Sequence, residues 1–283
     1  MNKNHTIAFL GPKGTFVEEA LLTAYPGLSD KQLVPYPTMQ EVIEAVGKNE
    51  VDKGIVAIEN SIEGSVNATL DTLVHGAQVL IENELVARIS HNLLARAGVT
   101  KKQIRTVVSH PQASAQCFNW IRKHLPDAAT RAANSTADAA RIVAKEDGSL
   151  AAIGTELAAS LYGLHVLAKN IQDYKDNQTR FVVIGHEPAA RTGADKTSIV
   201  CFIHKDRPGS LLQILQEFAF RNINLTKIQS RPTRRALGEY CFFIDFEGHI
   251  EDEIVQEALK CLRCKLREVK MLGSYPRSTV KKQ

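Results

Sequence analysis

The pattern of hydrophobic and polar residues divides the chain into two regions. From Thr6 to about Gly185, short apolar runs alternate with stretches whose apolar residues recur at helical spacing. The apolar runs predict strands at Thr6–Gly11, Gln32–Tyr36, Gly54–Glu59, Val79–Ile89, Thr106–Ser109, Ala151–Gly154 and Phe181–Ile184. The periodic stretches predict helices at Phe16–Ala24, Met39–Lys48, Val66–Val74, Ala113–His124 and Thr136–Lys145. This alternation is typical of an α/β domain with a mainly parallel sheet.

A polar segment with proline and glycine but no periodicity follows at residues 187–195 and predicts a linker. Beyond it the pattern predicts a strand at Thr197–Ile203, a helix at Ser210–Phe220, strands at Leu225–Ser230 and Tyr240–Phe246, a helix at Glu251–Leu262 and a strand at Glu268–Leu272. The order β-α-β-β-α-β is that of the ferredoxin-like motif. We therefore expect one domain at residues 1–186 and a second at residues 196–283.

Composition restricts the class of protein. With 44% hydrophobic and 23% charged residues, the 283-residue chain is expected to be soluble and globular. Its net charge of +4 comes from scattered basic residues, which does not favour nucleic acid as a partner. No apolar run reaches membrane-spanning length, and we expect neither a signal peptide nor a membrane partner. The odd number of cysteines, five, favours reduced thiols and a cytoplasmic location.

Two of these cysteines, Cys261 and Cys264, have the spacing of a CxxC metal or redox motif. Apolar residues recur at helical spacing through the same stretch, and no second Cys or His pair lies nearby. We interpret the pair as part of an amphipathic helix.

Polar or glycine-rich segments adjoin four of the predicted strands, where ligands bind in open α/β sheets. In the first, Gly11–Phe16, Thr15 could cap a helix whose N–H groups face an anion, although a plain turn has the same pattern. In the second, Asn60 and Ser61 offer neutral donors and Glu59 an acid at the strand end. Turn-forming residues before a capped helix are the alternative interpretation of this second segment.

The third segment begins with Ser109 and His110, and Pro111 then fits the first turn of a helix. Gln112 and Gln116 lie one turn apart and are expected to share a face of that helix. A lone histidine such as His110 is more often structural than catalytic.

In the fourth segment, Thr179 and Arg180 stand at the entry of the predicted strand Phe181–Ile184. Adjacent side chains on an extended chain point to opposite faces. Both can therefore serve one pocket only if the strand edge itself lines it.

Taken together and in order, these segments resemble the signatures of the prephenate dehydratase family. The matching residues are Gly11–Phe16, Glu59–Gly64, Ser109–Gln112 with Gln116-Cys117, and Thr179–Phe181. The last region, with Arg207–Leu211 and Ile228–Pro232, is similar to the ACT regulatory domain attached to that enzyme. The resemblance covers about residues 6 to 275.

The resemblance implies a catalytic domain of two α/β lobes, similar to those of periplasmic binding proteins, with the active site between them. It implies conversion of prephenate to phenylpyruvate, water and carbon dioxide in L-phenylalanine biosynthesis, without metal or organic cofactor. It also implies feedback regulation by L-phenylalanine through the ACT domain. Because ferredoxin-like domains have edge strands that often pair, we expect a homodimer or homotetramer.

Site residues follow from the same resemblance. Thr179 matches the essential threonine of the family, and Asn60, Ser109 and Gln116 match polar positions important for catalysis or binding. The predicted substrate-binding residues are Thr15, Glu59, Ser61, His110, Gln112, Arg180 and Phe181. The predicted effector-binding residues are Pro208, Gly209, Ser210, Leu211, Gln229, Ser230, Arg231 and Pro232.

Two positions depart from the family pattern. Val17 stands where a small polar residue is usual, which puts a direct role for that position in doubt. Gln229 replaces a glutamate, so a carboxylate that would help to hold the ammonium group of the effector is a neutral amide here. We expect weaker effector binding as a result.

The chemistry of prephenate favours neutral donors. Loss of carbon dioxide pushes electrons into the ring and expels the hydroxyl, and Thr179 could hydrogen-bond that oxygen without a charge to desolvate. A cation paired with the departing carboxylate would stabilise the ground state. Arg180 is therefore expected either to hold the other carboxylate or, as strand alternation favours, to brace the loop through Glu59 or another acid. Thr179, Glu59, His110 and water all remain possible proton donors.

Three alternative functions share this pattern in whole or in part. An arogenate dehydratase would perform the same chemistry on the amino-acid form of the substrate. A non-enzymatic sensor of amino acids or aromatic acids would also have a binding cleft and a ligand-sensing tail. The last domain could be a passive dimerisation module.

Overall fold

The computed structural model describes residues 5–76, 78–146, 148–205 and 207–278. The chain forms two compact units. The first contains the chain up to Val42, Asn60–Glu63 and Ala87–Thr179, and the second contains Ile43–Glu59, Gly64–Val86 and the chain from Arg180 onward. The boundary between the units thus passes between residues 59 and 60 and again between residues 179 and 180.

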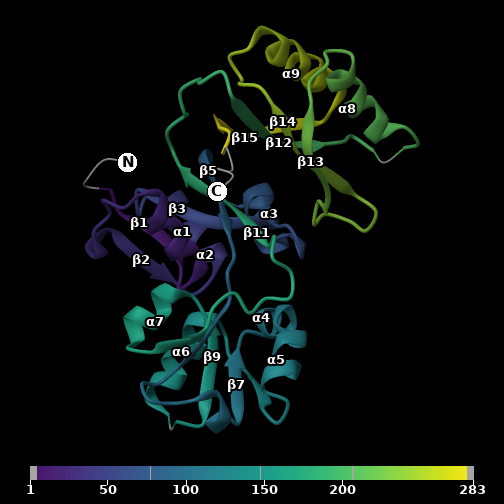
Figure 1. Ribbon diagram of the computed structural model, residues 1–283. Helices are drawn as coiled ribbons and strands as arrows, with labels where there is room; N and C mark the ends of the chain where they lie inside the picture. Colours follow the sequence, from purple (N-terminus) through teal and green to yellow (C-terminus); the bar gives the residue numbers. More distant parts are fainter. Residues whose placement is uncertain (1–4, 77, 147, 206, 279–283) are drawn as a thin grey trace. The chain divides into compact units, whose positions relative to one another are not determined.

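The first unit begins with two parallel strands and then forms a mixed sheet (Figure 1). Its first elements are β1 (Ile7–Leu10), α1 (Phe16–Ala24), β2 (Leu33–Tyr36) and the start of α2 (Met39–Gly47). The sheet has the order β10-β6-β9-β7-β8. Its strands are β6 (Asn92–Ala95), β7 (Thr106–Ser109), β8 (Ala129–Ala132), β9 (Leu150–Gly154) and β10 (His165–Ala168).

Helices cover both faces of this five-stranded sheet (Figure 1). They are α4 (Pro111–Gln116), α5 (Phe118–His124), α6 (Thr136–Lys145) and α7 (Glu156–Tyr162). Neighbouring strand residues alternate between the two cores: Val107 packs with α4 and α5, whereas Val108 packs with α6 and α7. Side-chain caps begin the helices, since Thr15, Ser135 and Thr155 accept from backbone N–H groups of α1, α6 and α7.

The second unit contains most of three neighbouring strands, in the order β3-β11-β5, and β4, which is paired to β3. These are β3 (Lys53–Asn60), β4 (Gly64–Ser65), β5 (Leu80–Arg88) and β11 (Gln178–Gly185), and helix α3 spans Asn67–His75. Strand β11 is buried over nearly all of its length, including Thr179 and Arg180. The polar residues that precede Phe181 therefore belong to the strand itself.

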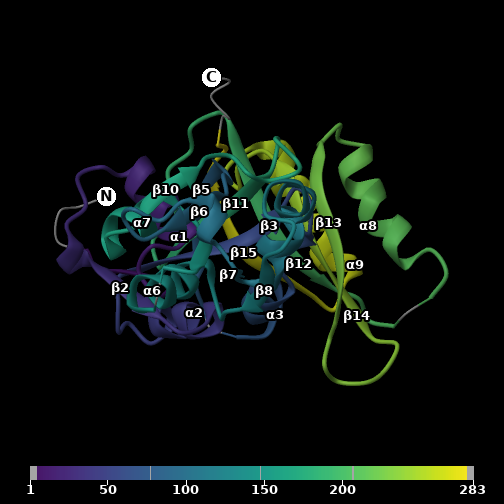
Figure 2. The same cartoon turned by 60° about the horizontal axis from the view of Figure 1, so that its bottom comes forward.

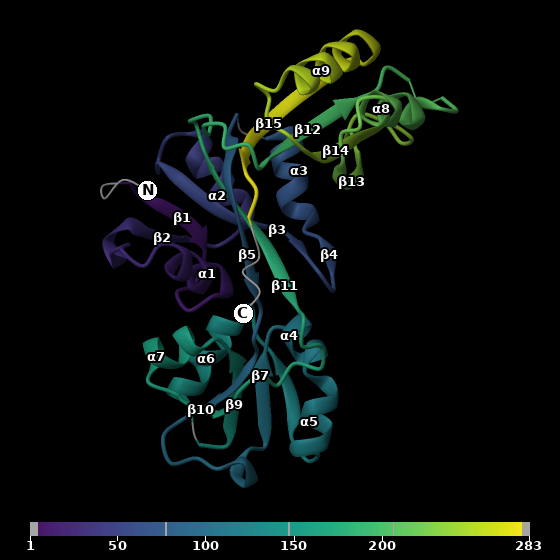
Figure 3. The same ribbon diagram turned by 45° about the horizontal axis from the view of Figure 1, so that its top comes forward.

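The C-terminal region of the second unit is a ferredoxin-like βαββαβ fold, as predicted. Its elements are β12 (Asp195–Phe202), α8 (Ser210–Ala219), β13 (Leu225–Pro232), β14 (Tyr240–Glu247), α9 (Glu253–Lys265) and β15 (Glu268–Pro276). The strands are antiparallel in the order β13-β14-β12-β15, with β13 at one edge beside α8 (Figure 2). Both helices pack on one face of the sheet, and α9 runs along β15 (Figure 3).

Most predicted elements are confirmed, but several expectations were wrong. The predicted helix Ala113–His124 is divided at Cys117 into α4 and α5. The sheet of the first unit is mixed rather than mainly parallel, because β6 is antiparallel to both of its neighbours. Strand β15 continues to Pro276, beyond the predicted Leu272. Strands β4, β6, β8 and β10 and helix α7 were not predicted.

In the described part of the chain, no helix is long and apolar enough to cross a membrane.

Candidate active site

The side chain of Asn60, at the end of β3, is fixed by hydrogen bonds at both ends of its amide. Its Oδ1 accepts from the backbone N–H groups of Ile62 and Glu63, each at 3.0 Å. Its Nδ2 donates to Asn177 Oδ1 at 2.8 Å and to Thr179 Oγ1 at 2.9 Å. Because the acceptor end is used within the turn, the donor end must point toward Thr179.

The contacts continue from Asn177 to Gln116. Asn177 Nδ2 donates to Gln116 Oε1 at 2.9 Å, and Gln116 Nε2 donates to Glu63 Oε1 at 3.2 Å. Thr179, Asn60, Asn177 and Gln116 therefore form one connected set of neutral polar groups, here called the amide chain. All four side chains are buried. Three of the four predicted catalytic residues lie in this chain, and Ser109 does not.

The hydroxyl of Thr179 is suited to donate a hydrogen bond. It accepts from Asn60, so its own proton remains to be donated. Donation to a departing oxygen requires no charged group to lose its solvation, because both partners are neutral.

His91 joins the amide chain and was not predicted from the sequence. Its Nε2 donates to Gln116 Oε1 at 2.9 Å, and its ring lies edge-to-face on Phe16 with centroids 5.1 Å apart. Burial lowers the pKa of His91, and the hydrogen bond to Gln116 offsets this only in part. The neutral ring therefore has a free acceptor, Nδ1, which is buried and has no protein partner among the described residues.

Asn177 was also missed, although it lies two residues before Thr179. Asparagine before a strand is typical of a turn, and nothing local distinguishes this one. His91 follows an apolar strand and belongs to no recognised motif. Both roles depend on contacts with residues distant in sequence.

The first predicted segment does not form an open anion site. Thr15 Oγ1 donates to the carbonyl of Leu10 at 3.0 Å and caps α1 by accepting from Glu18 N. The carboxylate of Glu18 accepts from the N–H of Gly14 at 2.5 Å, so an anionic side chain of the protein already lies at this turn. Ser61, in the second segment, accepts from the N–H of Gln178 at 2.9 Å and holds the turn.

The third segment contributes only Gln116 to the amide chain. Ser109 is fully buried, and its hydroxyl donates to the carbonyl of Ile153 at 3.2 Å. His110 caps α4, because its Nδ1 accepts from Gln112 N at 3.3 Å, and the Gln112 side chain is exposed. Gln112 and Gln116 lie one turn apart on α4 as expected, but only Gln116 is buried.

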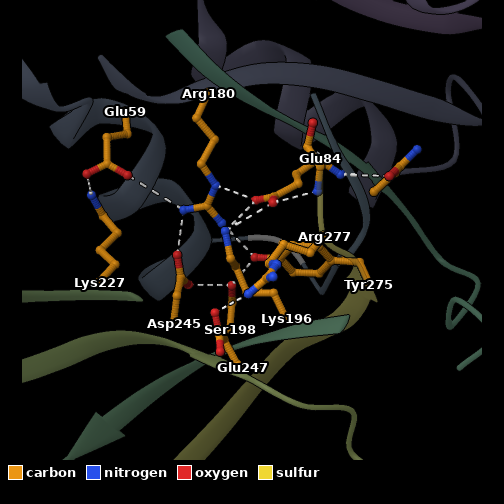
Figure 4. A network of polar contacts seen from close by, with 12 residues as sticks. Glu59, Glu84, Arg180, Lys196, Ser198, Lys227, Asp245, Glu247, Tyr275 and Arg277 are labelled. Carbon is orange, nitrogen blue, oxygen red and sulfur yellow. Dashed lines mark hydrogen bonds and ion pairs between the residues drawn. The ribbon is translucent and has the colours of Figure 1, made fainter. Parts of the chain in front are cut away.

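Arg180 contacts acids of the protein rather than an open surface (Figure 4). Its guanidinium donates to Glu84 at 2.7 Å and to Asp245 at 2.5 Å, and its Nη1 lies 3.7 Å from the Glu59 carboxylate. Phe181, next to it, is buried in the core. These contacts go against substrate binding by Arg180 or Phe181 and agree with the alternative that Arg180 braces its strand.

Among the residues that the structure describes, no group of three or more His, Cys, Asp or Glu side chains could hold a metal ion. Cys261 and Cys264 both lie on helix α9, as the periodicity predicted.

Residues 7–189 match the family model of prephenate dehydratase, and residues 197–263 match that of the ACT domain. The chain belongs to the prephenate dehydratase family. The C-terminal ferredoxin-like region is its ACT domain.

Individual relatives extend along almost the whole chain. Prephenate dehydratase of Mycobacteroides abscessus is 43% identical over 280 residues, which cover 96% of this chain and 90% of the relative. The crystal structure of prephenate dehydratase from Arthrobacter aurescens in complex with L-Phe is 41% identical, with a TM-score of 0.89 over 96% of this chain and 90% of that one.

A further solved structure is described as GqqA, a novel type of quorum quenching acylase. It is 28% identical with a TM-score of 0.86, over 98% of this chain and 100% of that one. One fold thus has two described activities, so the function of this chain must be argued from its site.

The predicted effector residues of the ACT domain lie in two places. Pro208, Gly209 and Ser210 precede or begin α8, and Gly209 has the positive φ of 87° that glycine readily adopts. On β13, Gln229 accepts from Ser65 at 3.2 Å, and Arg231 donates to Asp71 and Asn67. Leu211 is half-buried on α8, whereas Ser230 and Pro232 are exposed on the other side of β13. Gln229 and Arg231 therefore already have partners in the segment that carries β4 and α3.

Proposed function

We propose that this protein converts prephenate to phenylpyruvate, water and carbon dioxide in L-phenylalanine biosynthesis. The observation that carries this conclusion is the amide chain, in which Asn60 holds the Thr179 hydroxyl as a hydrogen-bond donor. It occurs in a chain that belongs to the prephenate dehydratase family.

The reaction takes up one proton and breaks two bonds of the ring. The bond from the ring to its carboxylate breaks, and its electron pair enters the ring as carbon dioxide leaves. The bond to the ring hydroxyl then breaks with its pair on oxygen, and the hydroxide leaves as water after taking a proton. Aromatisation drives both steps, so the protein needs mainly to orient a dianion and to assist the leaving oxygen.

Thr179 supplies this assistance by donating a hydrogen bond to the departing oxygen. A neutral donor favours the transition state because negative charge grows on that oxygen as the bond breaks. The Asn60, Asn177 and Gln116 amides fix the direction of the donor before substrate arrives. A cation beside the ring carboxylate would instead stabilise a charge that the reaction removes.

The decisive experiment supplies the purified protein separately with prephenate and with arogenate. A prephenate dehydratase releases phenylpyruvate from the first, whereas an arogenate dehydratase releases phenylalanine from the second. A sensor binds its ligand without consuming it. Calorimetric binding with no product from either compound would contradict the proposal.

The ACT domain binds L-phenylalanine as an allosteric effector in this proposal. The relative from Arthrobacter aurescens was solved in complex with L-Phe at 41% identity, which supports the assignment. Replacing Gln229 by Glu restores the carboxylate of the usual family pattern, and we expect it to lower the L-phenylalanine concentration that gives half-maximal inhibition.

The protein acts as a cytoplasmic homodimer or homotetramer, with a catalytic domain at residues 1–186, a linker at 187–195 and the ACT domain at 196–283. Exposed apolar side chains on or directly after α8, and on or near the edge strand β13, support association through the ACT domain. They are Leu212, Phe220, Ile228 and Leu237. Light scattering coupled to gel filtration measures the oligomeric state, and a monomer at micromolar concentration would contradict it.

A further inference from the structure

A cluster of buried charges joins three strands of the catalytic domain to the ACT sheet (Figure 4). We call it the Arg180 cluster, and its ionic members are Arg180, Lys196, Lys227, Glu59, Glu84 and Asp245. Three are cations and three are anions, so the formal charges cancel. Every member except Glu59 is at least nine-tenths buried as a side chain.

Arg180, on β11, is the centre of this cluster. Its Nε donates to Glu84 on β5, its Nη1 to Asp245 on β14 and its Nη2 to the hydroxyl of Tyr275 on β15. Burial alone would lower the pKa of Arg180, but Asp245, Tyr275 and Glu84 outweigh it and raise the pKa. The side chain is therefore a fixed cation whose three nitrogens have different partners.

The acids on either side of Arg180 are each held by more than one group. Asp245 also accepts from the Ser198 hydroxyl at 2.5 Å, and Glu84 accepts from Lys196 Nζ at 2.9 Å. Burial would raise the pKa of Glu84, but Arg180 and Lys196 overcome this effect and lower it. Moving the ACT sheet away would leave buried charges on both sides without partners, which is costly.

A second connection runs to β3. Lys227 on β13 lies 3.0 Å from the carboxylate of Glu59 and donates to the Ser65 hydroxyl at 2.7 Å. Lys227 and Asp245 are paired across β13 and β14, so both project from the same face of the ACT sheet. The helices α8 and α9 pack on the opposite face.

Arg180 and Glu59, the two catalytic-domain residues that Asp245 and Lys227 contact, are covalent neighbours of the amide chain. Arg180 follows Thr179 directly, and Glu59 directly precedes Asn60. A side chain held by several short contacts fixes the backbone of its own residue and hence the peptide plane beside it. The direction of the Thr179 hydroxyl and of the Asn60 amide depends on those planes.

We propose that Asp245 and Lys227 of the ACT domain are positioning residues for catalysis, which act through Arg180 and Glu59 to align Thr179 and Asn60. This inference rests on the proposed function. The ACT domain then contributes directly to turnover in the absence of effector. A movement of β14 would reach Thr179 through one side-chain contact and one peptide bond, and a movement of β13 would reach Asn60 in the same way.

The test uses the full-length variants Asp245→Asn and Lys227→Met, with Glu247→Gln as the matched control. Glu247 lies two residues from Asp245 on the same strand and pairs with the exposed Arg277 instead of the cluster. We expect kcat for prephenate to fall about tenfold to a hundredfold in Asp245→Asn, because a small misplacement of a donor has an effect of this size. KM should change less than about twofold, since the alignment matters in the transition state. Wild-type kcat in both cluster variants would overturn the proposal.

A double-mutant cycle separates positioning from general stability. In the Thr179→Val background, Asp245→Asn should lower kcat no further, because there is no donor left to align. An equal fold-loss in both backgrounds would overturn the proposal. If Asp245→Asn does not fold, Lys227→Met carries the same comparison, because its partner Glu59 is partly exposed and loses less on becoming unpaired.

A spectroscopic readout keeps this test distinct from that of the function itself. Thr179 is observed through its ¹³C-labelled methyl group and is assigned by the loss of its resonance in Thr179→Val. We expect the resonance to shift or broaden in Asp245→Asn and Lys227→Met and to stay in place in Glu247→Gln. A wild-type protein without turnover would defeat the proposed function, whereas an unmoved resonance in both cluster variants would defeat the positioning role.

Discussion

Two pairs of neighbouring residues, at the end of β3 and the beginning of β11, have opposite electrostatic surroundings. Asn60 and Thr179 contact each other and neutral amides, whereas Glu59 and Arg180 contact buried charges. The alternation of side chains along a strand permits this division within a single residue step. A reaction that removes negative charge from a ring is served by neutral donors, and the charges on the adjoining residues serve to hold those donors in place.

Replacing Thr179 by Val tests the role of the neutral pair, Asn60 and Thr179, and should have the largest effect on turnover. Valine keeps the shape of the side chain but removes the donor, and kcat should fall about a thousandfold, or about 4 kcal/mol in the barrier. Prephenate affinity measured by calorimetry should change little. The matched variant Thr179→Ser keeps the hydroxyl and should retain most of the turnover. Near-normal kcat in Thr179→Val would exclude the donor role.

Replacing Glu84 by Gln tests how much the buried charges of the Arg180 cluster contribute to stability. The substitution leaves Lys196 buried without its carboxylate, so the free energy of unfolding should fall by about 3 kcal/mol. The control Glu247→Gln removes a partly exposed ion pair and should cost about 1 kcal/mol or less. Urea denaturation followed by circular dichroism measures both. Equal losses would mean that burial adds nothing to the cluster.

The pH dependence of the free energy of unfolding of Glu84→Gln tests whether the charge of Glu84 is the cause of this loss. Glu84 has a lowered pKa in the folded protein, because Arg180 and Lys196 outweigh the effect of burial. Its stabilising contribution is therefore present above its ordinary value of 4.5 and is lost as the pH falls through the lower folded value. We expect Glu84→Gln to lose less of its remaining stability than wild type over that acid range.

The contrast also explains what the sequence could predict. Thr179, Asn60 and Gln116 could be named as candidates because each stands in a motif that resembles a signature of the family: Thr179 enters an apolar strand, Asn60 ends one, and Gln116 lies on the helix that follows another. The partners of Arg180 were not found, because Glu84 lies 96 residues away along the chain and Asp245 lies 65 residues away. Alternation along the strand still indicated that Arg180 braces rather than binds.

The missed elements of the fold have a physical explanation of the same kind. Strand β8 is exposed along its whole length at the edge of its sheet, so it has none of the apolar alternation of a half-buried strand. Helix α7 has only seven residues, too short for a clear helical period. Pairing with β7 and packing against the sheet, rather than local sequence, decide these two elements.

The amide chain should behave as a unit, which Asn177→Ala tests. The substitution removes the link between Asn60 and Gln116, and each of these two side chains loses one of its hydrogen-bond partners. We expect kcat to fall about tenfold, because Thr179 keeps its bond to Asn60 but loses the support behind it. Steady-state assays with prephenate measure the change. The exposed Asn119→Ala on helix α5 is the control and should leave kcat unaltered.

The smallest effect concerns His91, whose burial beside Phe16 and Gln116 disfavours the charged form of the ring. Burial lowers its pKa below the ordinary value of 6.5, so the unfolded chain binds this proton more readily than the folded protein does. The contribution of His91 to stability is therefore complete above pH 6.5 and declines as the pH falls toward its folded pKa. Urea midpoints of wild type should drop between about pH 6.5 and 5, and His91→Asn should flatten that slope. His165, which is exposed on β10, provides the control. If His165→Asn flattens the slope equally, protonation of the buried His91 ring is not the source of the pH dependence.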